Sequence, residues 1–174
     1  MEKPEKIILL DADVIIHFNK AGHLLTLKKI FPKRLHVLDV VIQELSNHKN
    51  TKEIIDNFLN FGIAAVMQFP PDNQIKKEYA MLRRKFGNGE SACMAVARFN
   101  ENILASSNLK DIEEYCTKYN IEYLTTMDFL EEAYKANIFD EATSDLFIYD
   151  VKSKGSKLPC NTIKEYLLIK KNRT

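Results

Sequence analysis

The chain has 174 residues, which is enough for one single-core domain and too few for two comfortable ones. Hydrophobic residues make up 45% and charged residues 28%, an ordinary globular composition that argues against disorder. The formal net charge of +1 gives no overall electrostatic reason to expect binding to nucleic acid or a membrane. The apolar run 7–10 is too short for a signal peptide, and no stretch approaches the roughly 18–20 apolar residues of a membrane helix.

Charge is unevenly distributed along the chain. Residues 151–174 carry seven basic side chains against one acidic side chain, a net +6, which leaves −5 for the first 150 residues. An acidic body suits the collection of divalent cations and a basic tail suits phosphate or an acidic partner, although a solvated terminus without a role explains the tail equally well. The three cysteines are far apart and lack C-x-x-C spacing, so we expect reduced thiols and a cytoplasmic protein.

The first elements predicted are short and alternate between strand and helix. The apolar run 7–10 stops at Asp11, which is typical of a strand buried on both faces of a parallel sheet. Helical stretches are expected over about 13–19 and 22–30, and a second strand over 35–38.

The middle of the chain predicts helices around one apolar segment. A helix is expected over 39–48, and another begins at a Thr51 cap and ends near residue 61. The apolar segment 63–69 is a strand or an extended connection, and Asp72 caps a helix over 73–85. This last helix is rich in basic residues, which either form a solvated face or contact a nucleic-acid backbone, and the sequence favours neither explanation. The residues are Lys76, Lys77, Arg83, Arg84 and Lys85.

After a glycine-containing turn the alternation resumes. We expect an apolar helix over 90–99, a strand over 103–105, a helix over 109–119, a strand over 121–124 and a helix over 126–136. The remaining residues are expected to be helical, with a break at 154–155. This order predicts a three-layer α/β/α fold with a central parallel sheet in residues 1–136, and a helical, basic C-terminal extension in residues 137–174 packed on or near it. Ligands bind such sheets outside the carboxyl ends of the strands.

Two acids follow the first strand. Asp11 and Asp13 would repel each other at a buried strand end, and burying both is unfavourable unless a cation compensates. We therefore interpret Asp11 as a metal ligand and Asp13 as its support. A plain helix cap is the alternative for Asp11.

Two further acids stand on apolar helix faces. Glu44 shares a face with Val41 and Leu45, and Glu90 shares one with Met94 and Cys93. A carboxylate on a buried face needs a partner, so both are candidate metal ligands. The alternatives are a side chain that reaches water for Glu44 and a favourable helix dipole for Glu90.

The segment after the third core strand adds another acid. Asn108 and Asp111 have the spacing of a capping box, which would explain both without any chemistry. However, Asp11 and Asp111 follow different core strands, and Glu44 and Glu90 lie on helices from the same sheet edge. Four acids on one crevice would repel without a cation, and hard oxygen ligands without His or Cys favour Mg²⁺ or Mn²⁺. The residues predict metal-dependent phosphoryl chemistry.

These segments together resemble the PIN-domain nucleases, including the toxin ribonucleases of bacterial toxin–antitoxin pairs. The similarity covers about residues 6–136 and is carried by four segments: LDADVII around Asp11, VIQEL around Glu44, GNGESACMAVA around Glu90 and ASSNLKDI around Asp111. The segment Thr126–Phe129 also resembles the last strand–helix junction of the family, where Asp128 is a further acid. This chain has Asn108 and Glu90 where Asp is common in the family.

The resemblance implies the PIN fold and a Mg²⁺- or Mn²⁺-dependent endoribonuclease that cleaves single-stranded or structured RNA. The metal ligands would be Asp11, Glu44, Glu90 and Asp111, with Ser106 and Asn108 as hydrogen-bonding support in the pocket. It also implies a homodimer and an antitoxin protein as partners.

Two other functions remain open. The pair Asp11 and Asp13 also matches the D-x-D opening of haloacid-dehalogenase-type phosphatases, but that fold leaves Glu44 and Glu90 unexplained. A PIN-like module that binds RNA or protein without catalysis is the other alternative. Loss of activity with a chelator would separate a nuclease from such a module.

Overall fold

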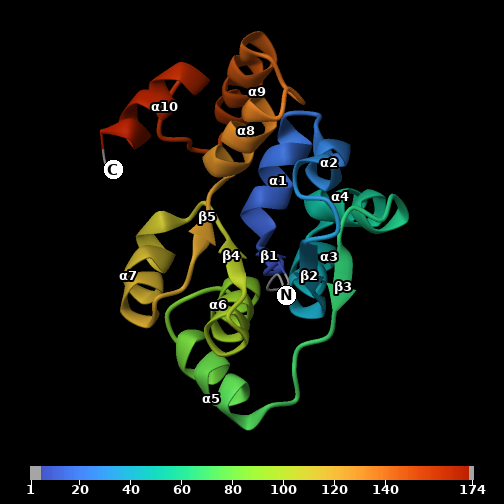
Figure 1. Cartoon of the computed structure of the whole chain (residues 1–174). Coiled ribbons are helices and arrows are strands. Elements are labelled where there is room, and N and C mark those ends of the chain that lie inside the picture. Colours follow the sequence, from blue (N-terminus) through green and yellow to red (C-terminus); the bar gives the residue numbers. More distant parts are fainter. Residues whose placement is uncertain (1–4, 173–174) are drawn as a thin grey trace.

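A computed structural model describes residues 5–172, and in it these residues form a five-stranded parallel sheet flanked by ten α-helices (Figure 1). The strand order is β3-β2-β1-β4-β5. The strands are β1 (Ile8–Leu10), β2 (Leu35–Leu38), β3 (Ala65–Met67), β4 (Ile103–Ala105) and β5 (Tyr123–Leu124). The predicted α/β fold class with a central parallel sheet is therefore confirmed.

Strand β1 lies in the middle of the sheet because its residues are apolar on both faces. Ile8, Leu9 and Leu10 are fully buried, as expected of a central parallel strand. The strand pairs with β2 through Ile8 and Leu35 and with β4 through Leu10 and Ala105. The backbone N–H of Asp11 still donates to the carbonyl of Ala105 at 2.9 Å, so the β1–β4 ladder holds the residue that follows β1 in place.

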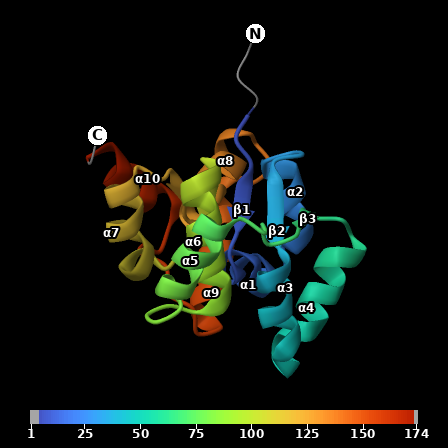
Figure 2. The ribbon, with the colours of Figure 1, turned by 90° about the horizontal axis from the view of Figure 1, so that it is seen from below.

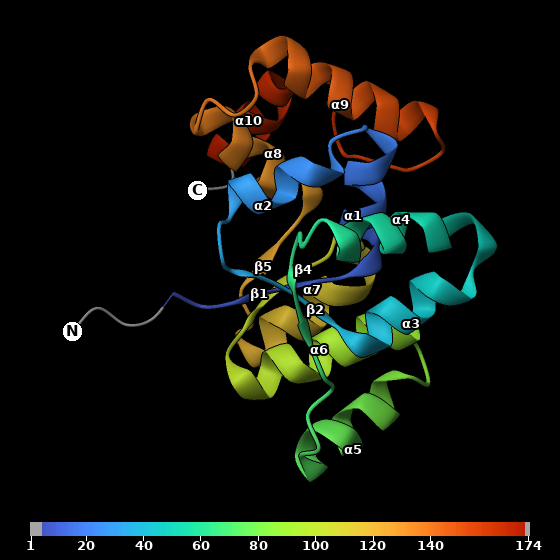
Figure 3. The same cartoon turned by 90° about the vertical axis from the view of Figure 1, so that its right-hand side faces the viewer.

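Helices cover both faces of the sheet, as Figure 3 shows with the sheet between two helical layers. One layer contains α1 (Ala12–Lys20), η1 (Leu24–Thr26), α2 (Leu27–Ile30), α4 (Lys49–Asn60), α8 (Thr126–Lys135), α9 (Glu141–Ser153) and α10 (Ile163–Lys171). The other contains α3 (Asp39–Asn47), α5 (Asn73–Leu82), α6 (Asn88–Asn100) and α7 (Leu109–Tyr119). Seen from below, α5, α6 and α7 lie next to one another (Figure 2). Helix α6 is buried for most of its length because small and apolar residues, from Ala92 to Ala97, follow its first turn.

Several predicted boundaries differ from the structure. Helix α4 begins at Lys49, and Thr51 does not cap it: the Thr51 hydroxyl donates to the carbonyls of Leu45 and His48 at the α3–α4 corner. Helix α5 is capped by Asp72 as predicted but ends at Leu82, three residues earlier than expected. The segment 63–69 contains a three-residue edge strand, β3.

The chain after residue 136 folds back onto the domain. Phe147, Ile148 and Val151 of α9 and Ile163 of α10 are fully buried in the same apolar core as the sheet. Helix α9 packs on α1, and α10 packs on α8 and α9. Within residues 5–172, no helix is long and apolar enough to cross a membrane. Arg173 of the predicted basic tail lies outside the described residues, as do residues 1–4.

Candidate functional site

The candidate site lies where the chain connections of the sheet reverse direction. From β1 the chain crosses to β2, whereas from β4 it crosses the opposite way to β5. The carboxyl ends of β1 and β4 therefore open into a crevice at the topological switch point, where α/β sheets bind ligands. Asp11 and Asp13 follow β1 at this edge, and the segment from Ser106 to Asp111 follows β4.

Asp11 begins helix α1 and is 6% exposed. Its Oδ1 accepts a hydrogen bond from the backbone N–H of Ala12 at 2.8 Å. Burial raises the pKa of Asp11 well above its usual range, and repulsion from Asp13, Glu90 and Glu44 adds to this effect. Ionisation of Asp11 is therefore unfavourable, and among residues 5–172 no lysine or arginine pairs with its carboxylate.

Asp13 connects α1 to the segment after β4. Its Oδ2 accepts hydrogen bonds from the backbone N–H of Ser107 at 2.7 Å and from the Ser106 hydroxyl at 3.3 Å. Its Oδ1 is buried and has no hydrogen-bond partner among the described residues. Burial raises the pKa of Asp13 although the bond from Ser107 opposes the rise. A buried carboxylate oxygen without a partner is unusual in a folded protein and suggests a missing ligand.

Glu44 connects α3 to the first turn of α6. Its Oε2 accepts a hydrogen bond from the backbone N–H of Gly89 at 2.6 Å, while Val41 on the same helix face is fully buried. A Cβ atom on Gly89 would lie 3.1 Å from this Oε2, 3.2 Å from Val41 Cγ2 and 3.5 Å from Asp11 Oδ1. Glu44 and Asp11 therefore both face the glycine backbone, and the absence of a side chain there permits the close approach.

Glu90, in the first turn of α6, is joined to Asp111 through Asn108. The Asn108 amide donates to Glu90 Oε1 at 3.3 Å and to Asp111 Oδ2 at 2.7 Å. The capping box that the spacing of Asn108 and Asp111 resembles does not form, because the Asn108 side chain makes no hydrogen bond to the helix backbone. Burial raises the pKa of Glu90 to about 7, with further repulsion from Asp111 and Asp13.

The structure thus places five of the predicted residues at one sheet edge: Asp11, Asp13, Glu44, Glu90 and Asp111. None of them pairs with a lysine or arginine in the part of the chain that the structure describes. Among residues 5–172, however, no group of three or more His, Cys, Asp or Glu side chains is arranged so that it could hold a metal ion. Several carboxylate oxygens instead accept hydrogen bonds from backbone and amide groups of the protein.

A second polar layer behind these carboxylates was not predicted from the sequence. The Ser107 hydroxyl donates to Thr126 Oγ1 at 2.6 Å and accepts from the Thr126 N–H at 2.8 Å. His17 Nδ1 lies 2.8 Å from the same Thr126 Oγ1. Burial lowers the pKa of His17 to about 4, so this imidazole is neutral at pH 7. The sequence feature that could have indicated this layer is the hydroxyl residues that follow β4 and β5, since both strands end at the same sheet edge.

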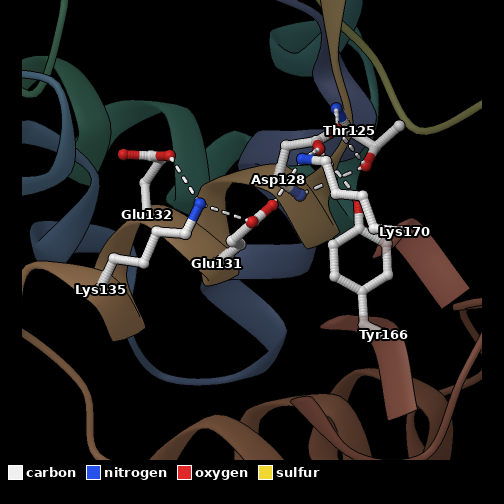
Figure 4. Close-up of polar contacts among 7 residues, drawn as sticks. All are labelled: Thr125, Asp128, Glu131, Glu132, Lys135, Tyr166 and Lys170. Carbon is white, nitrogen blue, oxygen red and sulfur yellow. Dashed lines mark hydrogen bonds and ion pairs between the residues drawn. The ribbon is translucent and has the colours of Figure 1, made fainter. Parts of the chain in front are cut away.

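Asp128, predicted as a supporting acid, lies in a different set of contacts (Figure 4). It forms a capping box with Thr125 at the start of α8. Its Oδ1 accepts from the Tyr166 hydroxyl at 2.8 Å and pairs with Lys170 Nζ at 2.7 Å, and Lys170 also pairs with Glu131. Asp128 therefore links α10 to α8, and within residues 5–172 no hydrogen bond or ion pair connects it to the five carboxylates.

The predicted nucleic-acid-binding residues lie on and after α5 and are all exposed. Lys76 and Lys77 stand on the helix, and Arg83, Arg84 and Lys85 follow its end. The guanidinium carbon of Arg83 lies 5.5 Å from the ring centre of Tyr79.

Comparison with known protein-family models and with curated proteins finds no match to this chain.

Proposed function

We propose that the protein is a divalent-metal-dependent endoribonuclease whose metal ligands are Asp11, Glu44, Glu90 and Asp111. The observation that supports this most strongly is the group of acids at the β1–β4 switch point, which are buried or half-buried without ion pairs. Burial and mutual repulsion raise the pKa values of Asp11 and Glu90. A cation at this place would remove that repulsion.

The donor atoms suit Mg²⁺ or Mn²⁺. The acidic side chains offer hard oxygen ligands, and Asp13 Oδ1 is a buried oxygen without a protein partner. Because the carboxylates now accept hydrogen bonds from Gly89 N–H, Ala12 N–H and the Asn108 amide, ligation requires some of them to rotate. Rotation about side-chain torsions achieves this without movement of the sheet.

When bound, such a cation would polarise a phosphodiester and lower the pKa of a water molecule for in-line attack. The protein's own residues would set the geometry. Asp13 holds the segment after β4 against α1 through its hydrogen bond from the Ser107 N–H. The Asn108 amide donates to both Glu90 and Asp111 and so sets their relative position. Without a cation, burial raises the pKa of Glu90 to about 7, and a bound cation would lower that pKa and hold the carboxylate ionised as a ligand.

RNA as the substrate, a homodimer and an antitoxin partner are parts of this proposal that rest on the resemblance to PIN-domain nucleases. A non-catalytic module that binds RNA through the exposed basic residues from Lys76 to Lys85 is the competing function. That module would keep its affinity for RNA after the carboxylates are neutralised, since its binding depends on lysines and arginines.

The test is cleavage of labelled single-stranded, hairpin and duplex RNA and DNA with Mg²⁺, Mn²⁺ or EDTA. The proposal predicts cleavage that EDTA abolishes and that Asp11→Asn lowers at least a hundredfold. Asp140→Asn is the matched control, because Asp140 caps α9 away from the crevice and Asn is an equally good cap. Cleavage that persists in EDTA, or that Asp11→Asn leaves unchanged, would contradict the proposal, and RNA binding without cleavage would support the module.

A further inference from the structure

A pocket of about 310 Å³ lies between α5 and α7. Both helices belong to the layer that contains α6. Met81 and Leu82 of α5 form one side, Tyr115 and Tyr119 of α7 form the other, and Phe86 from the turn after α5 closes it. This volume is at the lower end of the range for small-molecule pockets, so its occupant must be about the size of a single ring system.

Three of the residues that line this pocket carry aromatic rings: Phe86, Tyr115 and Tyr119. The rings of Tyr115 and Tyr119 meet edge to face with their centres 4.7 Å apart. The guanidinium carbon of Arg98 lies 3.5 Å from the ring centre of Tyr119 and so covers one of its faces. The Tyr115 hydroxyl donates to Glu78 Oε1 at 2.8 Å, and Glu78 pairs with Arg98 at 2.8 Å. These contacts hold Tyr115 in one orientation, and a fixed aromatic ring is a good stacking surface.

The pocket lining carries three carboxylates, Glu78, Glu114 and Asp111, and two lysines, Lys85 and Lys118. Lys85 and Lys118 are exposed side chains on the lining, where ammonium groups can meet the phosphates on either side of a bound base. Glu114 is exposed and offers hydrogen-bond acceptors to the edge of a base, whereas Glu78 already accepts from Tyr115 and pairs with Arg98. A stacking surface flanked by lysines is the usual arrangement for single-stranded nucleic acid.

The pocket shares one residue with the candidate active site. Asp111 lines it, and the same carboxylate is joined through the Asn108 amide to Glu90. A second cavity of about 330 Å³ shares Glu78, Met81 and Tyr119 with the first and extends toward Lys77. The two cavities therefore lead away from the carboxylates along α5.

We propose that the α5–α7 pocket binds one unpaired nucleobase next to the cleaved phosphodiester, stacked against Tyr115 and Phe86. This inference rests on the proposed nuclease function and adds the subsite that positions the substrate strand. A paired base inside a duplex cannot enter the pocket, because its faces are already stacked on its neighbours. The pocket therefore selects unpaired segments and fixes which phosphodiester reaches Asp111.

The experiment uses a labelled single-stranded RNA with one cleavage site, in which each nucleobase in turn is replaced by an abasic nucleotide. The full-length protein is assayed beside Tyr115→Leu, which removes the ring, and Tyr115→Phe, which keeps the ring and removes only the hydroxyl. Phe86→Leu is a second variant in case Tyr115→Leu does not fold. The readout is kcat/KM for each RNA, together with the position of the cut.

One abasic position beside the cut should lower kcat/KM about tenfold with the wild-type protein, which corresponds to about 1.4 kcal/mol. The same replacement should have no further effect in Tyr115→Leu or Phe86→Leu, whereas Tyr115→Phe, which keeps the ring but loses its hydrogen bond to Glu78, should still show a loss at that position. Two results would refute base binding in the pocket while the nuclease proposal stands. One is metal-dependent cleavage with the same kcat/KM at every abasic position. The other is a dependence on abasic position that both leucine variants leave unchanged.

If the protein does not cleave RNA, the nuclease proposal fails separately, and the same abasic series is measured by fluorescence anisotropy. A single position whose loss weakens binding, and only while the ring at Tyr115 is present, would still support a base-binding pocket. Binding that is equal across the series, or no binding, would overturn it.

Discussion

Replacing Glu90 by Gln should stabilise the metal-free protein at alkaline pH, although it removes a proposed metal ligand. Burial, with repulsion from Asp111 and Asp13, raises the pKa of Glu90 from 4.5 to about 7. The unfolded chain therefore loses this proton at a lower pH than the folded chain does. The free energy of unfolding falls as the pH rises from about 4.5 to about 7, and the loss is complete above that range.

At about 1.4 kcal/mol per pKa unit this loss is about 3.4 kcal/mol, and solvent screening in the crevice reduces it to about 2 kcal/mol. Glu90→Gln lacks the charge and keeps an acceptor for the Asn108 amide. At pH 8 in EDTA its free energy of unfolding should therefore exceed that of the wild type by about 2 kcal/mol, or about 4–8 °C in Tm for a chain of this size.

Urea unfolding at pH 8 and at pH 5.5, with EDTA throughout, measures this difference. The advantage of Glu90→Gln should shrink at the lower pH, because the folded wild type then holds the proton. Adding Mg²⁺ at pH 8 should stabilise the wild type and leave the variant nearly unchanged. A variant that is less stable than the wild type at pH 8 in EDTA would refute the view that Glu90 is an uncompensated carboxylate.

Three further predictions concern other contacts. Gly89→Ala places a Cβ atom 3.1 Å from Glu44 Oε2, so it should lower nuclease activity about tenfold or more. The circular dichroism spectrum should stay that of the wild type. Full activity of this variant would show that Glu44 need not hold this position. Lys170→Met leaves Asp128 and Glu131 without their shared cation, and urea unfolding at pH 7 should show a loss of about 1–2 kcal/mol. Burial opposes the ionisation of Asp128, but hydrogen bonds from Lys170, Thr125 and Tyr166 outweigh it and lower its pKa. This loss should therefore be present above about pH 4 and decline as the pH falls through the folded pKa, and a difference that does not decline in acid would contradict that origin. Ser107→Ala removes the hydrogen bonds between Thr126 and the segment that holds Asp13, and it should destabilise the protein by about 1 kcal/mol in thermal melts. An unchanged melting temperature would contradict this prediction.

The sequence predicted the sheet well because its strands are short apolar runs with a single interpretation. Ile8–Leu10 and Ile103–Ala105 are buried on both faces, which is the pattern that a parallel strand requires. The edge strand β3 was less clear, since Ala65 and Val66 are exposed and an extended connection has the same composition. Thr51 shows another limit of sequence-based prediction. A threonine before a helical pattern predicts a cap, but at the α3–α4 corner the Thr51 hydroxyl donates hydrogen bonds to carbonyl groups instead.

The carboxylates could be predicted because each follows a core strand or interrupts an apolar helix face. Their supports could not, because they depend on contacts between distant segments. The bond from Ser107 to Asp13 joins residues 94 positions apart, and His17 lies 109 positions from Thr126. Asp128 was predicted as a supporting acid because it is a carboxylate at a strand–helix junction. In the structure it instead binds Tyr166 and Lys170 of α10, a helix that lies beyond the segment that carries the family resemblance.

The central claim is that the crevice at β1 and β4 binds a divalent cation, and calorimetric titration of the purified protein with Mn²⁺ tests it most directly. We predict saturable binding to the wild type, retained binding in Asp140→Asn, and loss of at least tenfold in affinity in Asp11→Asn and in Asp13→Asn. Absence of binding to the folded wild type, or equal affinity in all four proteins, would contradict the account.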